Sequence, residues 1–257
     1  MRDYMRWQMM FVLIMMALGM MFFLACRFFK NRGNTAKPGM VIILNGASAS
    51  GKSTLQKELQ KHFNEPCLGL GLDTFFVGVL PERFILGPRQ PDDVPASLVM
   101  EGVPSMDVDG NKLFVLNIGS IGDRVMSGMH HAIAAYARTG NNCIVDYIAY
   151  KSEWIPDLLS ALKGIPVYFV GVDCSLDELE KREKARGRSF VEGHARSHYK
   201  MVHEHMHDCY DIRVDTSRMN APECAQVIMK QIRDHKPTAF MMISNKVSVR
   251  ISHGNGK

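Results

Sequence analysis

The sequence predicts a three-layer α/β fold in which helices cover both faces of a mainly parallel β-sheet. Three observations support this fold class. Apolar runs of strand length alternate with segments of helical periodicity, at residues 40–45, 67–72, 142–146, 166–172 and 210–214. A glycine-rich turn joins the first of these runs to the first helix. The 257 residues are 46% apolar, enough to bury a sheet on both faces.

The amino-terminal 39 residues precede this pattern and form a segment of their own. Residues 9–26 are uncharged and mostly apolar, about the length of one thin or extended membrane span. Two cations precede the run and four follow it, so the positive-inside bias predicts a single-pass anchor that tethers a cytoplasmic domain to the inner face of the membrane. Two other interpretations stay open: an export signal that ends at Cys26, and a true translation start at Met40.

Composition narrows the classes of partner. The net charge of +5 is modest and much of it lies before residue 38, so it gives little support to a nucleic-acid partner. The six cysteines are widely spaced and include no C-x-x-C pair, which fits a reducing cytosol. We therefore expect one main domain at residues 40–236, followed by a tail at 237–257.

A phosphate-binding pattern, Gly46-x-x-x-x-Gly51-Lys52-Ser53, follows the first apolar run and opens the first helix. With this spacing the glycines let backbone N–H groups surround a polyphosphate, Lys52 reaches the β- and γ-phosphates, and the Ser53 hydroxyl binds Mg²⁺. The positive end of the helix dipole favours the same anion. The motif predicts a nucleoside triphosphate site formed by Gly46, Ala47, Ser48, Ala49, Ser50, Gly51, Lys52, Ser53 and Thr54.

The elements after this loop follow in order. A helix at 52–63 ends before Pro66, and the second strand carries Asp73 at its carboxyl end, where open α/β sheets bind ligands. Residues 81–105, rich in proline and charge, are expected to form a loop-rich excursion over the substrate pocket. A hairpin at 106–115 and a helix at 123–138 complete the first half.

The second half continues the alternation. The third strand ends in Asp146, and helices are expected at 152–162, at 175–186, at 195–207 and at 222–235. Ser175 and Glu178 have the spacing of a capping box at the start of the second of these helices. The tail is expected to add an edge strand at 246–251.

Four further side chains are candidates for chemistry at the carboxyl edge of the sheet. Asp146 resembles the acidic residue that holds Mg²⁺ or its waters in phosphate-loop enzymes, and Asp73 is the candidate base beside the γ-phosphate. Arg186 and Arg188 lie where nucleotide kinases carry a lid that neutralises the transferring phosphoryl group. The alternatives are that the aspartates cap helices and that the arginines are solvated helix-end charges.

Five histidines lie between residues 194 and 207, and His194 and His198 are spaced at i and i+4. Because no cysteine or carboxylate completes a zinc ligand set, a polar helix face is the preferred interpretation of this segment.

Several of these segments together resemble the chloramphenicol phosphotransferase family: residues 41–53, 71–75, 128–132, 144–146, 170–172, 182–187 and 210–217. The resemblance spans about residues 40–235. It implies a P-loop kinase-like fold and an enzyme that moves the γ-phosphate of ATP to a hydroxyl of a small molecule. In the enzyme that gives the family its name, this small molecule is chloramphenicol. The family's catalytic aspartate falls on Asp73, its phosphate lysine on Lys52, and its lid arginine on Arg186. The family also implies a role in antibiotic resistance.

Two other functions are weighed against this one. A membrane-attached nucleotide switch is suggested by Asp107-x-x-Gly110, the D-x-x-G spacing of GTPases, although no Asn-Lys pair is followed by the aspartate that guanine recognition needs. A P-loop kinase that acts on a nucleotide-sugar or a macromolecule is the other alternative.

Overall fold

The structure is a computed structural model that describes residues 15–16, 19–21, 37–85, 90–187, 191–199 and 201–254, with side chains described as far as residue 247. It divides into two units, Met1–Lys37 and Pro38–Lys257. In the first unit, residues 15–16 and 19–21 are helical. Among the described residues no helix has both the length and the apolar character needed to cross a membrane, and most of the expected span at 9–26 lies outside them.

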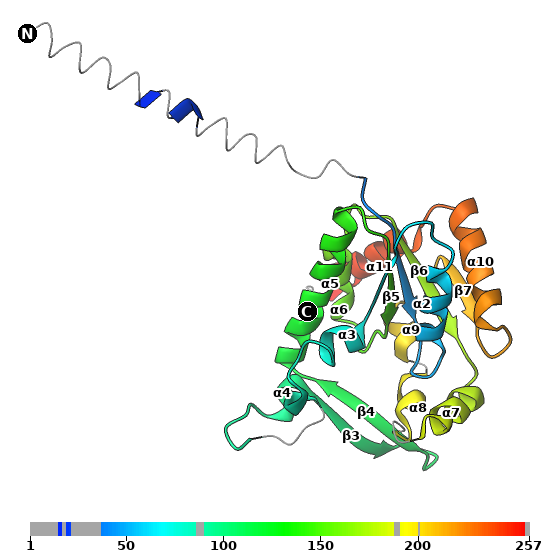
Figure 1. Ribbon diagram of the computed structural model, residues 1–257. Helices are drawn as coiled ribbons and strands as arrows, with labels where there is room; N and C mark the ends of the chain where they lie inside the picture. Colours follow the sequence, from blue (N-terminus) through cyan, green and yellow to red (C-terminus); the bar gives the residue numbers. More distant parts are fainter. Residues whose placement is uncertain are drawn as a thin grey trace, which may run out of the picture. The chain divides into compact units, whose positions relative to one another are not determined.

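The described part of the second unit contains a five-stranded parallel sheet (Figure 1). Its strands lie in the order β2 (Leu68–Gly71), β5 (Cys143–Tyr147), β1 (Val41–Asn45), β6 (Val167–Asp173) and β7 (Ile212–Asp215). In β1 every residue is buried, because a central strand is covered by a neighbour on each side and by helices on each face. This position puts the loop that follows β1 at the middle of the sheet's carboxyl edge.

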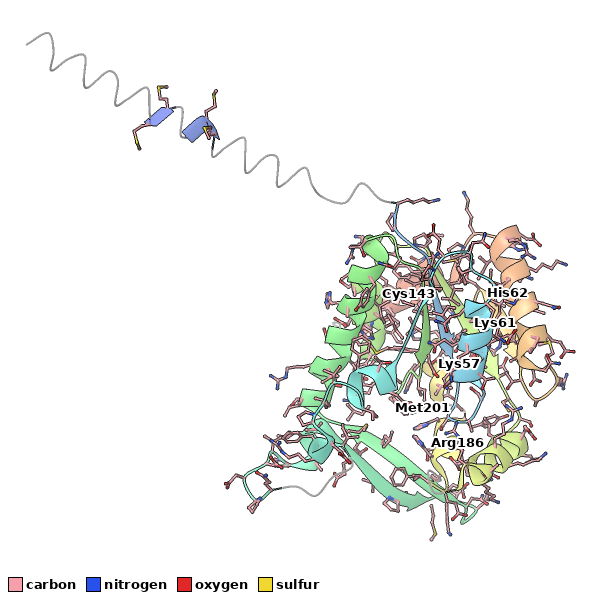
Figure 2. The ribbon with its side chains drawn as sticks, in the orientation of Figure 1. Lys57, Lys61, His62, Cys143, Arg186 and Met201 are labelled. Carbon is pink, nitrogen blue, oxygen red and sulfur yellow. The ribbon has the colours of Figure 1, made fainter. Side chains whose placement is uncertain are left out.

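Helices cover both faces of the sheet, as the sequence predicts. On one face lie α5 (Ser120–Arg138), α6 (Trp154–Ala161) and α11 (Ala239–Gly254), and on the other α2 (Lys52–Gln60) and α10 (Ala221–Asp234) (Figure 1). The alternation along β1 divides the core accordingly: Val41 and Ile43 pack with the first group, and Ile42 and Leu44 with the second. In Figure 2, Lys57 marks the exposed side of α2 and Lys61 follows its end, whereas Cys143 lies within the sheet.

Smaller elements surround the carboxyl edge. They are α3 (Leu72–Phe76), the 3₁₀ turn η1 (Glu82–Phe84), α4 (Ala96–Val99), the antiparallel pair β3 (Met100–Met106) and β4 (Lys112–Ile118), α7 (Leu176–Ala185), α8 (His194–His198) and α9 (Met201–His205). The hairpin expected at 106–115 is present with longer strands. Its turn is closed by Asp107, whose carboxylate accepts hydrogen bonds from the backbone N–H groups of Asp109 and Asn111 at 3.0 and 2.8 Å. Asp107 therefore closes the turn of this hairpin.

The structure of the carboxyl-terminal tail differs from the one predicted. Residues 246–251 belong to helix α11 and not to an edge strand. The helix forms because Ala239, Ile243 and Val247 recur at every fourth position, and this apolar face packs on the core beside β6 and α6. Asp211 fixes its start, since its Oδ1 accepts a 2.9 Å hydrogen bond from the Ala239 N–H. The alternating β-branched residues of the tail suggested a strand, but burial of the helical stripe decides the structure.

Two helix predictions are also wrong in detail. Ser175 precedes α7 without making a side-chain cap, and Glu178 accepts a 2.9 Å hydrogen bond from Arg182 Nε. A capping box does form at the start of α10, between Asn220 and Glu223. The histidine-rich helix expected at 195–207 is two short helices, α8 and α9, with residue 200 between them outside the described residues.

Candidate active site

The loop after β1 has a conformation that its sequence requires. Gly51 adopts φ 88°, a left-handed value that glycine takes without strain, and Ala49 also has a positive φ of 65°. Gly46 lies so close to β6 that a Cβ there would be 2.5 Å from the Val172 carbonyl oxygen. The loop therefore turns tightly over the end of the sheet and leads into α2 at Lys52.

Lys52 is almost fully buried, with 5% of its side chain exposed. Its ammonium group donates a 2.8 Å hydrogen bond to the Ala47 carbonyl of its own loop and lies 3.6 Å from Asp146 Oδ1. Burial lowers the pKa of Lys52, and the charge of Asp146 opposes this shift. The arrangement places a partly desolvated ammonium group directly under the loop, where an anion would be drawn to it.

Ser53 and Asp146 meet at the same edge. β1 and β5 are adjacent and parallel, with Leu44 paired to Asp146, so the carboxylate projects beside the start of α2. Ser53 Oγ donates a 2.6 Å hydrogen bond to Asp146 Oδ2. A hydroxyl and a carboxylate are hard oxygen donors of the kind that Mg²⁺ prefers, so this pair fits a magnesium site.

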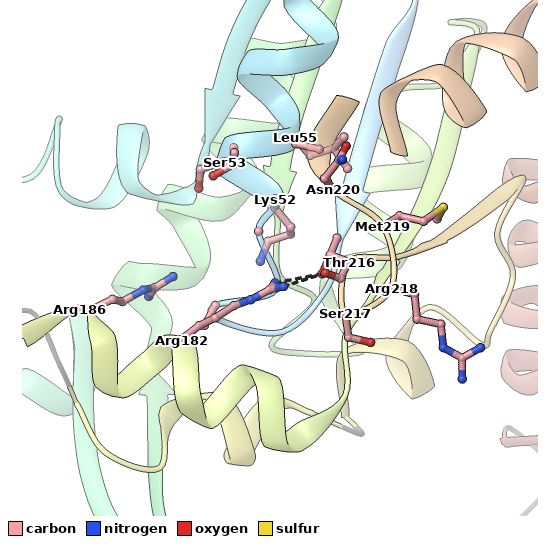
Figure 3. Close-up of a pocket in the computed structure, with 14 residues that line it drawn as sticks. Lys52, Ser53, Leu55, Arg182, Arg186, Thr216, Ser217, Arg218, Met219 and Asn220 are labelled. Carbon is pink, nitrogen blue, oxygen red and sulfur yellow. Dashed lines mark hydrogen bonds between the residues drawn. The ribbon is translucent and has the colours of Figure 1, made fainter. Parts of the chain in front are cut away.

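Two arginines of the α7 region face the loop. In Figure 3, Arg182 extends to Thr216 close to Lys52, and Arg186 projects from the end of α7. Arg182 donates hydrogen bonds to the side chain and the carbonyl of Thr216 at 3.2 and 2.7 Å, and the Thr216 hydroxyl donates in turn to the Ser50 carbonyl at 2.8 Å. Arg186 Nη1 donates to Ser48 Oγ at 3.4 Å. The α7 region is thus tied to the loop at two points.

Among the described residues three cavities border the loop, and two of them adjoin Lys52. The larger, about 670 Å³, lies between the loop, the arginines and the β7–α10 connection (Figure 3). The smaller, about 340 Å³, lies on the other side of Lys52, between β2, β5 and α8. Four residues line both cavities: Ala49, Lys52, Ser53 and Arg186. A molecule in either cavity would therefore contact Lys52 and Arg186, so molecules bound in the two cavities would share these two residues.

Asp73 lines the smaller cavity only, together with Asp146 and Tyr150. It stands in the first turn of α3, whose N-cap position is Gly71, so Asp73 is not a cap of that helix. Its side chain is exposed toward the cavity region and acts electrostatically on Lys52. The sequence-predicted Asp73, Lys52, Ser53, Asp146 and Arg186 thus come together, whereas Arg188 lies outside the described residues.

The sequence of this chain matches a known family over most of its length. The profile of the chloramphenicol phosphotransferase-like proteins aligns with residues 39–233. This chain belongs to the chloramphenicol phosphotransferase-like family. Membership confirms the expected enzyme class, a phosphotransferase of the kinase type.

Relatives of this chloramphenicol phosphotransferase-like chain include a protein described as "Putative O-phosphotransferase" in the CDC 1551 and H37Rv strains of Mycobacterium tuberculosis. It is 31% identical over 191 residues, which cover 73% of this chain and 80% of the relative. Among solved structures, a sugar kinase from Janibacter sp. HTCC2649 has a TM-score of 0.53 and 18% identity, over 76% of this chain and 95% of its own. The APS kinase of Mycobacterium tuberculosis has a TM-score of 0.49 and 16% identity, over 77% and 99%. At 18% identity the sugar-kinase likeness shows the fold alone.

Sequence reasoning missed three features of this family member's site. Arg182 is more firmly tied to the phosphate loop than Arg186, and its i, i+4 spacing from Glu178 was the only available signal. Thr216 connects β7 to the loop without any motif that marks it. His194 is half-buried and lines the smaller cavity, and His198 is buried against its ring, so the interpretation of a polar helix face is wrong for them.

Proposed function

We propose that this protein is an ATP-dependent O-phosphotransferase that transfers the γ-phosphate to a hydroxyl group of a small molecule such as chloramphenicol. The observation that carries this proposal is the pair of cavities that share Lys52, Ser53 and Arg186, with Asp73 lining only the smaller one. A transferase needs two sites that meet at the migrating group, whereas a nucleotide switch needs one. ATP belongs to the larger cavity and the acceptor to the smaller.

Each residue of the site has a distinct role in the proposed transfer. The Asp73 carboxylate accepts the proton of the acceptor hydroxyl, whose oxygen then forms a bond to the γ-phosphorus. The bond between that phosphorus and the bridging oxygen breaks, and ADP leaves with the electron pair. Lys52 and Arg186 stabilise the negative charge on the phosphoryl oxygens. Ser53 and Asp146 would hold Mg²⁺, which neutralises charge on the β- and γ-phosphates when bound.

The experiment that tests this function is a transfer assay with a panel of alcohols. Purified protein is incubated with ATP and Mg²⁺ and with chloramphenicol, aminoglycosides, nucleosides and nucleotide-sugars in turn, and products are identified by mass spectrometry. A mass increase of one phosphate on a small neutral alcohol supports the proposal. Phosphate found only on nucleotide-sugars or on protein would show that the acceptor is not a small neutral alcohol. Binding of GTP in preference to ATP, with no phosphate transfer, would favour the nucleotide switch. Chloramphenicol tolerance of cells that express the protein tests the implied role in resistance.

The location of the domain is a separate proposal. The cytoplasmic side, with a tether formed by residues 9–26, is supported by the distribution of cations around that run. Fractionation of cells that express the full chain or a chain starting at Met40 tests it. Equal recovery of both chains in the supernatant would remove the tether.

A further inference from the structure

One wall of the smaller cavity is built from two aromatic residues that the proposed chemistry does not use. Tyr150, after β5, and His194, the first residue of α8, line it together with Asp73. The inference below rests on the proposed function, because it assigns this wall a role in binding the acceptor.

The side chains at this wall have more atoms able to hydrogen-bond than they have hydrogen bonds. Within the described part of the chain, the only hydrogen bond of the His194 ring is a contact of 3.5 Å between Nε2 and the Tyr150 hydroxyl, the longest distance that qualifies. His198, directly behind, is 1% exposed, and neither of its ring nitrogens has a partner among the described residues. Its ring meets those of Tyr150 and His194 edge to face, with centroids 4.6 and 4.4 Å away. Of the two histidines only His194 lines the cavity, so its ring nitrogens are the ones that a molecule there could bond.

The two imidazoles carry no charge near neutral pH. Burial and the neighbouring charges of Arg186 and Lys52 lower the pKa of His194 to about 4. Burial lowers the pKa of His198 to about 2. A neutral imidazole has one donor and one acceptor nitrogen, so the wall offers both kinds of hydrogen bond to a molecule in the cavity.

The position of His194 is fixed relative to the arginines. The buried Glu183 of α7 accepts hydrogen bonds from the backbone N–H groups of Gly193 and Ala195, which flank His194, at 3.1 and 2.6 Å. On the other side, the Phe114 N–H of β4 donates to the Gly193 carbonyl at 3.1 Å. Because Glu183 and Arg186 are one helical turn apart, the histidine and the arginine are held in one rigid arrangement.

We propose that His194, with the Tyr150 hydroxyl, recognises the acceptor by hydrogen-bonding a second, uncharged polar group of the alcohol, apart from the hydroxyl that receives the phosphate. Two carboxylates, Asp73 and Asp146, and two cations, Lys52 and Arg186, line the same cavity, so its charges offset one another and select neither an anionic nor a cationic group. An uncharged amide, carbonyl or second hydroxyl matches the neutral hydrogen-bonding groups of the wall. His198 is a positioning residue that packs behind both rings.

The test compares His194→Phe, His194→Gln and Tyr150→Phe with a control, His131→Gln, in which an exposed histidine of α5 is changed. The acceptor is chloramphenicol or another panel alcohol that the wild type phosphorylates. We expect His194→Phe to raise the KM for the acceptor about tenfold or more, which is the loss of one good hydrogen bond, with a smaller change in kcat. His194→Gln should restore part of the affinity, and Tyr150→Phe should raise the same KM by about threefold. The KM for ATP should change less than that for the acceptor in every variant.

Other outcomes overturn the inference. An unchanged acceptor KM in His194→Phe and Tyr150→Phe would remove the wall from recognition. Equal losses in kcat and in the KM for ATP, with no rescue by glutamine, would reduce His194 to a structural role. If His194→Phe does not fold, as judged by its thermal unfolding, Tyr150→Phe and His194→Gln decide the question. If the wild type phosphorylates no alcohol of the panel, the proposed function fails, and this inference fails with it.

Discussion

The Ser53 hydroxyl donates a 2.6 Å hydrogen bond to Asp146 Oδ2, although the two residues are 93 positions apart in the chain. The bond joins the end of the phosphate loop to the neighbouring strand β5, and Lys52 lies 3.6 Å from the other oxygen of the same carboxylate. Asp146 thus connects the residue expected to hold the metal with the residue expected to bind phosphate.

Loss of either member of this pair should weaken the response to magnesium. We expect Ser53→Ala and Asp146→Asn each to lower kcat/KM by about 10- to 100-fold, because each removes one oxygen of the shared site. The Mg²⁺ concentration for half-maximal activity should rise in both. In the double variant the loss of transition-state stabilisation should be smaller than the sum of the losses in the two single variants, since the two side chains act together. Ser160→Ala, at an exposed position of α6, serves as the control, and additive losses would contradict a shared site.

Removal of the proposed base should separate catalysis from nucleotide binding. In Asp73→Asn we expect kcat to fall by about 10²- to 10⁴-fold, the usual range for a general base, with the Kd for ATP nearly unchanged. Transfer kinetics and isothermal titration with ATP measure the two quantities. Asp177→Asn, an exposed change in the first turn of α7, should leave both at wild-type values. Turnover near the wild-type rate in Asp73→Asn would mean that another group takes the proton.

The two arginines should have different kinetic effects. Arg182 is bonded to Thr216 and lines only the larger cavity, so Arg182→Met should mainly raise the KM for ATP, by about tenfold. Arg186 borders both cavities, so Arg186→Met should mainly lower kcat, by about 100-fold or more. Arg233→Met, exposed on α10, is the matched control. The same change of KM in both variants would refute this division.

Buried histidines should make the fold sensitive to acid. The pKa of His198 is about 2 in the folded state against an ordinary value of 6.5, so folding favours the neutral form and the free energy of unfolding falls as the pH drops below about 6.5. Between pH 7 and pH 5, the contribution of His198 to this loss is about 2 kcal/mol. His194 acts in the same direction down to about pH 4. Urea unfolding of His198→Asn should show a correspondingly smaller pH dependence, whereas His131→Asn should match the wild type. An unchanged pH dependence in His198→Asn would contradict the assignment.

The carboxyl-terminal helix should contribute to stability. Ile243 is fully buried against the sheet, so Ile243→Ala should lower the free energy of unfolding by about 2–5 kcal/mol. Met241→Ala, at a position 63% exposed, should change it by less than about 0.5 kcal/mol. Chemical denaturation of both variants provides the comparison. Equal small effects would indicate that α11 does not pack on the core in solution.

The fold could be predicted from the sequence to the extent that its signals are local. The apolar run from Val41, the glycine spacing and Lys52 lie within one short segment, and each strand carries its own apolar pattern. The tail could not be assigned this way, because the sequence of residues 246–251 has the alternation of a strand while the stripe of Ala239 and Ile243 begins further upstream. Which pattern prevailed depended on the surface available for packing.

The sequence by itself determined the order of the five sheet strands and of the longer helices as far as α10, the phosphate-binding loop and the family, because these depend on neighbours along the chain. Only the tertiary structure decided that Ser53 donates directly to Asp146, that Arg182 holds Thr216, and that His194 lines the smaller cavity with the buried His198 against its ring. These contacts join residues that come together through the pairing of parallel strands and the packing of α7 and α8, and such long-range contacts leave no periodic signal in the sequence.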